Sequence, residues 1–254
     1  MDSFYCVRAA RYRDHKAYKA LPGDLSCADG LLSERWDLVL TVTWIRHGES
    51  AANAGGASSD PALIPLTERG RAQAQAIAES IEAAPDLIVM SPFTRAQDTA
   101  APTLRKFPAT PVQVWPVEEF TYLSPADCMN TTAAQRRPWV QAYWQAGEPD
   151  HSNGPGTESF HGLVLRAQTA LQQLQGKTGS VLVFGHGQFM QVVRWLILLA
   201  PQRIDAAAMG SFRGFDEVNP IVNGEAVCFT FDGMRWSSAG VFCRSELARD
   251  ERQR

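Results

Sequence analysis

Residues 38–45 read LVLTVTWI and run directly into RHGES at residues 46–50. The first stretch is apolar and rich in β-branched side chains, which predicts a buried strand. The second stretch places an arginine, a histidine and a glutamate just beyond the carboxyl end of that strand. A buried strand needs covering elements around it, and the sequence that follows predicts them.

Short strands and longer helices alternate through the rest of the chain. Apolar runs predict further strands at residues 87–90, 112–115 and 181–184. Amphipathic or apolar stretches predict helices at residues 67–82, 94–105, 158–174 and 189–199, and Thr67 is placed to cap the first of them. Residues 226–231 and 234–236 flank Asp-Gly, a pattern typical of a hairpin at a sheet edge. This alternation predicts an α/β fold with a largely parallel sheet.

The length and composition are those of one generous globular domain. The 254 residues are 45% hydrophobic and 20% charged, which excludes wholesale disorder. The first residues show little periodicity, and the last dozen are charged and lack an apolar face of useful width. We therefore expect an N-terminal extension over residues 1–37, one domain over residues 38–240 and a charged tail over residues 241–254.

The same composition disfavours several classes of partner. Acidic residues outnumber basic ones by 27 to 24, so a general nucleic-acid binder is not expected. No stretch approaches the roughly 20 apolar residues of a membrane helix, so no membrane association is expected. The basic N-terminus lacks the apolar segment of a secretory signal. Five scattered cysteines show neither zinc-ribbon nor redox spacing, which favours reduced thiols and a cytoplasmic location.

The side chains that carry chemistry follow the predicted strands. In an open α/β sheet, ligands bind beyond the carboxyl ends of the strands. These ends hold, in chain order, Arg46 and His47, Ser91 and Arg95, Glu118 and Glu119, and His186. Each residue alone has a more ordinary interpretation, as a hydrogen-bonded turn histidine, a solvated arginine or an exposed loop carboxylate. Their joint placement at corresponding strand ends favours a binding or catalytic site.

Five segments resemble, in order, the motifs of the histidine phosphatase superfamily, the phosphoglycerate mutase-like phosphatases. They are RHGES at 46–50 with Asn53, LTERG at 66–70 with Gln73 and Ala74, Ser91-Pro92 with Arg95 and Ala96, GTES at 156–159, and FGHG at 184–187. The matches span about residues 39–235. The resemblance implies a three-layer α/β/α sandwich of the phosphoglycerate mutase-like kind.

The resemblance also implies a mechanism, and the residue types suit it. A neutral imidazole at His47 attacks phosphorus and carries a transient phosphoryl group. The nearby arginines disfavour protonation of this imidazole and, as planar cations, suit the phosphoryl oxygens. The expected substrate contacts are Arg46, Asn53, Arg95, His186 and Gly187. No cofactor and no metal is expected, because the protein's own cations neutralise the charge.

The resemblance implies a general acid in the loop after the third strand, where both Glu118 and Glu119 lie. In the family this acid is usually followed closely by an aromatic or basic residue. Glu119 directly precedes Phe120, so Glu119 is preferred and Glu118 remains the alternative. Side chains on adjacent extended residues point to opposite faces, so only one of the two is expected to reach the leaving group.

The predicted function is therefore a phosphomonoesterase that hydrolyses a small phosphorylated molecule through a phosphohistidine. A mutase-type phosphotransferase is the first alternative, and a non-catalytic module that binds a phosphorylated ligand is the second. The interval of 37 residues between Glu119 and Gly156 lacks the paired prolines of the mutases, which favours the phosphatase. Both histidines and the acid are present, which argues against a non-catalytic module.

The same interval holds two further candidates. Arg136 or Arg137 either contacts a second anionic group of the substrate or belongs to a solvated helix start. Trp139, Tyr143 and Trp144 lie at helical spacing, which predicts a packing face rather than a ligand site. The natural substrate and the oligomeric state do not follow from the sequence.

Overall fold

A computed structural model describes residues 39–57 and 60–242. Within them a sheet is formed in the order β3-β2-β4-β1-β5-β6. Its strands are β1 (Leu40–Arg46), β2 (Leu87–Met90), β3 (Val112–Val114), β4 (Gly179–Gly185), β5 (Ala226–Phe231) and β6 (Trp236–Phe242). The first four pair in parallel, whereas β5 and β6 add an antiparallel hairpin beside β1. The predicted sheet and its edge hairpin are confirmed.

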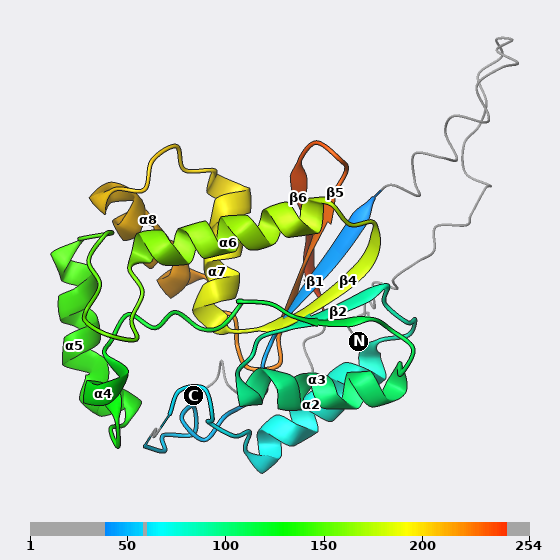
Figure 1. The fold of residues 1–254 in the computed structure, drawn as a ribbon, viewed down its shortest axis with the longest axis horizontal. Coiled ribbons are helices and arrows are strands. Elements are labelled where there is room, and N and C mark those ends of the chain that lie inside the picture. The colour runs from blue at the N-terminus through cyan, green and yellow to red at the C-terminus, as the bar shows by residue number, and fades with distance from the viewer. Residues whose placement is uncertain (1–38, 58–59, 243–254) are drawn as a thin grey trace, which may run out of the picture. The chain divides into compact units, whose positions relative to one another are not determined.

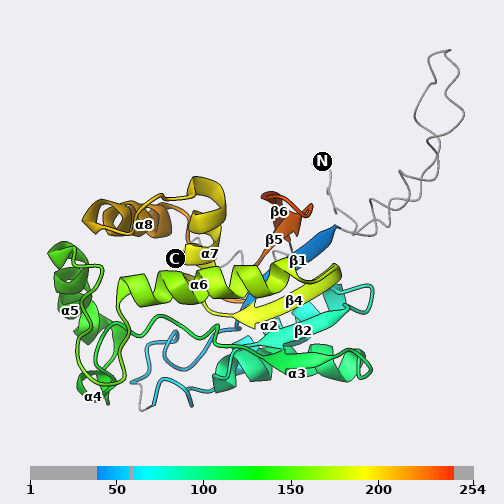
Figure 2. The same cartoon turned by 45° about the horizontal axis from the view of Figure 1, so that its top comes forward.

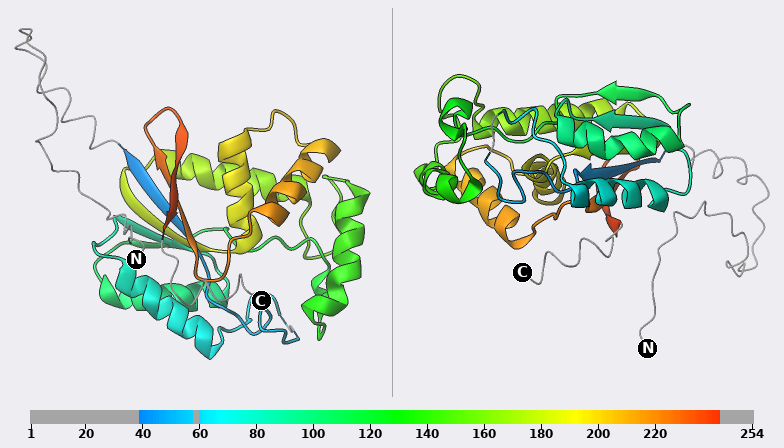
Figure 3. Two further views of the ribbon diagram at one scale, coloured as in Figure 1. Left: turned by 180° about the vertical axis from the view of Figure 1, so that it is seen from behind. Right: turned by 90° about the horizontal axis from the view of Figure 1, so that it is seen from below.

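Helices cover both faces of this sheet (Figures 1 and 2). One face carries α2 (Glu68–Ser80) and α3 (Thr94–Lys106), and the other carries α6 (Phe160–Gln175) and α7 (Gly187–Leu199). Three helices lie beyond one end of the sheet: α4 (Pro125–Cys128), α5 (Ala133–Ala146) and α8 (Ala206–Val218) (Figure 3). The three-layer α/β/α sandwich expected from the sequence is therefore confirmed.

Strand β1 lies in the middle of the sheet and faces two separate cores. Leu40, Val42 and Trp44 are fully buried in the core beneath α6 and α7, and the Trp44 ring lies 5.9 Å from that of Phe189. Ile45 points the other way, into the smaller core beneath α2 and α3. Thr41 and Thr43 alternate with the buried residues along the strand and are half-buried.

Most of the predicted elements match the observed ones to within a few residues, and the predicted cap is present. Thr67 accepts a hydrogen bond from the Gly70 amide at 3.0 Å. The strand expected at 112–115 is shorter, because β3 pairs only with β2 and its three residues are exposed at the sheet edge. Helix α8 was not predicted, since two glycines interrupt its apolar pattern.

The expected domain limits are only partly covered by the description. Strand β6 continues to Phe242, two residues past the expected boundary at 240. The extension over residues 1–37 and the tail from residue 243 lie outside the described residues, so both stay predictions. Among the described helices, none combines the length and the hydropathy needed to cross a bilayer.

Two glycines allow the loop after β1 to lie directly against the start of α2. A Cβ atom at Gly48 would lie 2.4 Å from the Gly70 carbonyl oxygen, and a Cβ at Gly70 would lie 2.0 Å from that of Glu49. Both obstacles are backbone atoms, which cannot turn aside as a side chain can. This close approach fixes the path of the chain immediately beyond His47.

We expect Gly70→Ala to lower the free energy of unfolding by at least about 2 kcal/mol, as measured by urea denaturation, because the methyl group has no room. Gly210→Ala in α8 is the matched control, since a Cβ there meets nothing within 4 Å. That variant should be neutral or more stable by about 0.5–1 kcal/mol, because alanine favours helix over glycine. Equal stability of the two variants would contradict the close approach.

Candidate active site

The fold brings together the polar side chains that follow β1, β2, β4 and the loop after β3. The Arg95 Nε lies 3.1 Å from His47 Nε2, and the two histidine rings, His47 and His186, have centroids 5.1 Å apart. All three side chains are at least nine-tenths buried. Glu119 is close enough to raise the pKa of Arg95. The predicted residues thus form one buried cluster.

His47 is held as a neutral imidazole with a defined tautomer. Its Nδ1 lies 2.7 Å from the Gly48 carbonyl oxygen, which can only accept, so the ring proton is assigned to Nδ1. Burial lowers the pKa of His47 well below its usual value of 6.5, and the charges of Arg95 and Arg46 lower it further. The expectation that the arginines disfavour protonation is confirmed. Nε2 is therefore unprotonated, and its lone pair accepts the hydrogen bond from Arg95 Nε at 3.1 Å.

Arg95 lies in the first turn of α3, and two contacts besides the one with His47 orient its side chain. Its Nη1 donates to the Pro61 carbonyl at 2.6 Å, and its guanidinium lies 5.0 Å from the centre of the Phe93 ring. Burial lowers the pKa of Arg95 to about 10, with Glu119 opposing that shift and Arg46 adding to it. Arg95 is still a cation at neutral pH.

Arg46 is the last residue of β1, and its guanidinium packs over the first residue of α7. A Cβ at Gly187 would lie 3.2 Å from Arg46 Nε and 3.3 Å from Cζ, so glycine leaves the room that this side chain occupies. The Arg46 Nη1 also donates to the Ile221 carbonyl. Gly187 therefore gives the Arg46 guanidinium the room that it needs. The expected contact of Gly187 with substrate stays a prediction.

The two glutamates of the loop after β3 have different surroundings. Glu119 Oε1 accepts hydrogen bonds from the backbone amides of Gln188 at 3.0 Å and Phe189 at 3.3 Å, in the first turn of α7. The Glu118 carboxylate pairs instead with Arg166, whose Nη1 lies 3.9 Å from Oε2. Glu119 thus belongs to the end of the sheet where the histidines lie, and Glu118 faces another element.

Arg166 of α6, which forms an ion pair with Glu158, holds the loop that carries Glu119. Arg166 donates from Nη1 to the carbonyl oxygens of Pro116 at 3.0 Å and Glu118 at 2.8 Å, and its other nitrogens bond the Glu158 carboxylate. The Glu158 amide in turn donates to the Thr121 carbonyl at 3.0 Å. Arg166 therefore holds the backbone on which Glu119 lies, although it belongs to none of the motifs that carry the histidines.

Asn53 lies beside the site but is exposed. Its Oδ1 accepts from the Ser50 hydroxyl at 2.8 Å and from Asn223 Nδ2 at 3.1 Å. Asn223 is buried and also donates to the His47 carbonyl at 3.0 Å. With Oδ1 occupied, the amide nitrogen is the part of the Asn53 side chain that remains for a ligand.

Three positioning residues were missed by sequence reasoning: Gln188, Arg166 and Asn223. Asn223 lies in the loop before β5, far along the chain from every motif that the sequence offers. Arg166 is an ordinary surface-type residue in a helix pattern. No spacing rule would have found either one, because backbone carbonyls, which carry no sequence signal, are among the partners of both.

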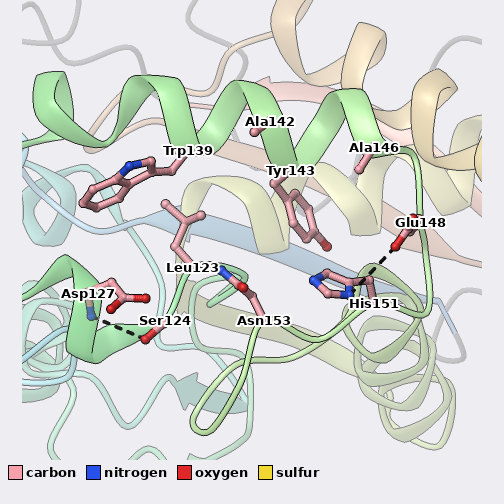
Figure 4. Close-up of a pocket in the computed structure, with 10 residues that line it drawn as sticks. All are labelled: Leu123, Ser124, Asp127, Trp139, Ala142, Tyr143, Ala146, Glu148, His151 and Asn153. Atoms are coloured by element: carbon pink, nitrogen blue, oxygen red, sulfur yellow. Dashed lines mark hydrogen bonds and ion pairs between the residues drawn. The ribbon is translucent and has the colours of Figure 1, made fainter.

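A separate cavity of about 650 Å³ lies between α5 and the segments around residues 123–127 and 148–153 (Figure 4). None of the predicted catalytic residues lines it. Trp139 lines it and is 42% exposed, so the expectation that it belongs to a packing face is wrong for this residue. Tyr143 and Trp144 do pack, against Phe120 and its neighbours.

The two arginines at the start of α5 have different surroundings, and an anion contact by either one stays a prediction. Arg136 Nη1 donates to the carbonyl and hydroxyl of Thr131, at 2.6 and 3.0 Å, and so fixes the helix start. Arg137 is exposed. Within residues 39–57 and 60–242, no group of three or more His, Cys, Asp or Glu side chains is arranged to hold a metal ion.

The buried neutral histidines predict a loss of stability in acid. Between about pH 7.5 and about pH 5.5 an unfolded histidine takes up most of a proton, which lowers the free energy of unfolding by about 1.4 kcal/mol for each histidine that stays neutral when folded. Stability should therefore fall with pH below the unfolded pKa. In His47→Gln this fall, measured by urea denaturation at both pH values, should shrink by about that amount.

The control for this measurement is His151→Gln, because His151 is exposed and lies outside the buried cluster. Its pH dependence should match that of the unmodified chain. An unchanged slope in His47→Gln would mean that His47 is protonated in the folded protein.

Comparison with known proteins identifies the family of this chain. The sequence model of the histidine phosphatase superfamily (branch 1) matches residues 42–211. The adenosylcobalamin/alpha-ribazole phosphatase of Escherichia coli is 31% identical over 176 residues, covering 66% of this chain and 82% of that protein. A 2,3-bisphosphoglycerate-dependent phosphoglycerate mutase 2 of Gloeobacter violaceus is 29% identical over 177 residues, covering 65% and 78%.

The fold has counterparts among solved structures. Mycobacterial glucosyl-3-phosphoglycerate phosphatase superposes with a TM-score of 0.61 at 22% identity, covering 80% of this chain and 98% of that one. At this identity the likeness concerns the fold alone. The family match spans the strands and loops that carry His47, Arg95, Glu119 and His186, and so the chain belongs to the histidine phosphatase superfamily.

Proposed function

We propose that this protein hydrolyses the phosphate monoester of a small molecule by way of a phosphohistidine at His47. The observation that carries the proposal is the state of that side chain. Its imidazole is neutral, its proton is held on Nδ1 by the Gly48 carbonyl, and its Nε2 lone pair lies 3.1 Å from a guanidinium. An uncharged nucleophile next to permanent cations is what an anionic phosphoryl group requires.

The first half-reaction transfers the phosphoryl group. A bond forms between His47 Nε2 and phosphorus while the bond from phosphorus to the ester oxygen breaks. Glu119 supplies the proton that the leaving oxygen needs, so the product is a neutral alcohol. Arg95 has to exchange its hydrogen bond to Nε2 for one to a phosphoryl oxygen, and Arg46 and His186 are placed to share the remaining negative charge.

The second half-reaction restores the enzyme. Water attacks phosphorus and gives a proton to the Glu119 carboxylate, while the nitrogen–phosphorus bond breaks and inorganic phosphate leaves. No net change occurs at either residue over the cycle. The Asn53 amide and the Gly187 backbone are proposed to complete the substrate contacts.

The class of substrate follows from the relatives and from the site. The E. coli relative is named adenosylcobalamin/alpha-ribazole phosphatase, and the net charge of this chain does not favour nucleic acid. We infer a small phosphate ester as substrate, and the scattered cysteines support a cytoplasmic location.

A mutase-type phosphotransferase is the alternative, and one of the relatives is named as a mutase. The two functions differ in whether water or a second hydroxyl accepts the phosphoryl group. The short interval after Glu119 favours water as the acceptor. Release of inorganic phosphate in step with alcohol would support the phosphatase, and transfer without release would support the mutase.

We expect His47→Ala to abolish turnover of phosphomonoesters while the far-UV circular dichroism spectrum stays unchanged. A nitrogen–phosphorus bond is hydrolysed in acid and is stable in base. Protein quenched during turnover of a labelled substrate should therefore carry an acid-labile, base-stable phosphoryl group on His47. His161→Ala is the control, because His161 is partly exposed and pairs with Asp150 at 2.8 Å. A label on serine or aspartate would overturn the mechanism.

We expect Glu119→Gln to lower kcat by roughly 10²–10⁴-fold for an alkyl phosphate, because the leaving alkoxide needs a proton. The loss should shrink for a nitrophenyl phosphate, whose leaving group hardly needs one. Glu118→Gln is the matched control one residue away, and it should change neither rate appreciably. Reversed behaviour of the two variants would assign the acid to Glu118.

A further inference from the structure

Ser91, the residue directly after β2, bonds the second histidine of the site. Its side chain and that of His186 are both fully buried. Ser91 Oγ lies 2.8 Å from His186 Nε2, and it also accepts a hydrogen bond from the Phe93 amide at 3.2 Å. The other ring nitrogen, His186 Nδ1, is buried and has no hydrogen-bond partner among the described residues.

The position of Ser91 is set by the sheet rather than by the loop that follows. Strands β2 and β4 are neighbours, with Met90 opposite Phe184, and the Ser91 amide donates to the Phe184 carbonyl at 3.0 Å. His186 comes two residues after Phe184. The hydroxyl and the imidazole are therefore held by two adjacent strands, which leaves neither side chain much freedom.

Counting protons decides between the two neutral tautomers of His186. If Nε2 carried the proton, it would donate to Ser91 Oγ, and the buried hydroxyl proton of Ser91 would have no acceptor. If Ser91 donates its proton to Nε2, its hydroxyl both donates a hydrogen bond and accepts one from the Phe93 amide. The ring proton of His186 then lies on Nδ1. Each arrangement leaves one buried donor unmatched, the Ser91 hydroxyl in the first and the His186 Nδ1–H in the second. The first arrangement also leaves the Nδ1 lone pair without a donor. Because each unmatched buried polar group costs free energy, the second arrangement, with fewer of them, is favoured.

We propose that Ser91 is a positioning residue that fixes His186 as the tautomer with its proton on Nδ1, so that this N–H donates to the phosphoryl group. The opposite tautomer would present a lone pair on Nδ1, which repels a phosphoryl oxygen. His186 then acts as a neutral, oriented donor beside His47, and the positive charge comes from the arginines.

The groups around His186 agree with this assignment. Burial lowers the pKa of His186 well below 6.5, and the charges of Arg95, Arg46 and Arg166 act in the same direction. The Phe93 ring packs edge-on against the imidazole, with centroids 5.3 Å apart. The role of Nδ1 as a donor rests on the proposed function, whereas the tautomer itself does not.

The tautomer is measured directly on the full chain without substrate. In a long-range ¹H–¹⁵N correlation spectrum of ¹⁵N-labelled protein near neutral pH, the His186 signals are identified by their loss in His186→Gln. We expect Nδ1 in the protonated range and Nε2 in the unprotonated range. The reverse pattern in the unmodified chain would overturn the proposal whether or not any variant folds.

Ser91→Ala removes the hydroxyl and should let His186 populate the other tautomer. We expect kcat for phosphomonoesters to fall by about tenfold or more with KM changed little, because the donor is needed most in the transition state. Ser91→Thr keeps a hydroxyl and should restore both the spectrum and kcat. An unaltered His186 tautomer in folded Ser91→Ala would overturn the role of Ser91.

Thr103→Val is the matched control for loss of a buried hydroxyl. Thr103 lies in α3, and its Oγ1 is buried without a partner in the described part of the chain. The variant should leave the His186 tautomer and kcat unchanged. If the unmodified chain shows Nδ1 protonated yet hydrolyses no phosphomonoester, the tautomer assignment is supported and the proposed function fails instead.

Discussion

The parallel pairing of β1 with β4 is the constraint on which the site depends. Its register sets Arg46 opposite Gly185, and the His47 amide continues the ladder by donating to the Gly185 carbonyl at 3.0 Å. His47 and His186 each follow the last paired residue of its strand, so their rings meet at one level. A slip of one residue would turn one histidine to the other face, since side chains alternate along a strand.

The site concentrates positive charge where water is scarce. Arg95 and both histidines are nearly fully buried, and burial pushes the pKa of all three downward. The histidines are therefore neutral. The arginines keep their charge and donate hydrogen bonds to backbone carbonyl oxygens, as Arg95 does to Pro61. A bound phosphoryl group would supply the negative charge that this cluster lacks. The free site is therefore organised for an anion before one arrives.

The sequence predicts the fold and the cluster well, because both depend on local patterns. Apolar runs identify β1, β2 and β4, and chemistry placed just after each strand follows from the parallel arrangement. What it cannot predict are contacts made through the backbone, such as those of Asn223 with the His47 carbonyl or Arg166 with the loop after β3. It also misplaces Trp139, because helical spacing alone does not say which face of α5 is covered.

The choice between the two glutamates shows how a local rule and a distant contact combine. Alternation along an extended chain says only that Glu118 and Glu119 diverge. The start of α7 distinguishes the two residues. Its first backbone amides, which have no partner within the helix, donate from Gln188 and Phe189 to one oxygen of Glu119. A helix start of this kind can itself bind an anion, but here the carboxylate occupies it. In the proposed mechanism these two amides are therefore not available to the phosphoryl group, because they hold Oε1 of the carboxylate proposed as the acid.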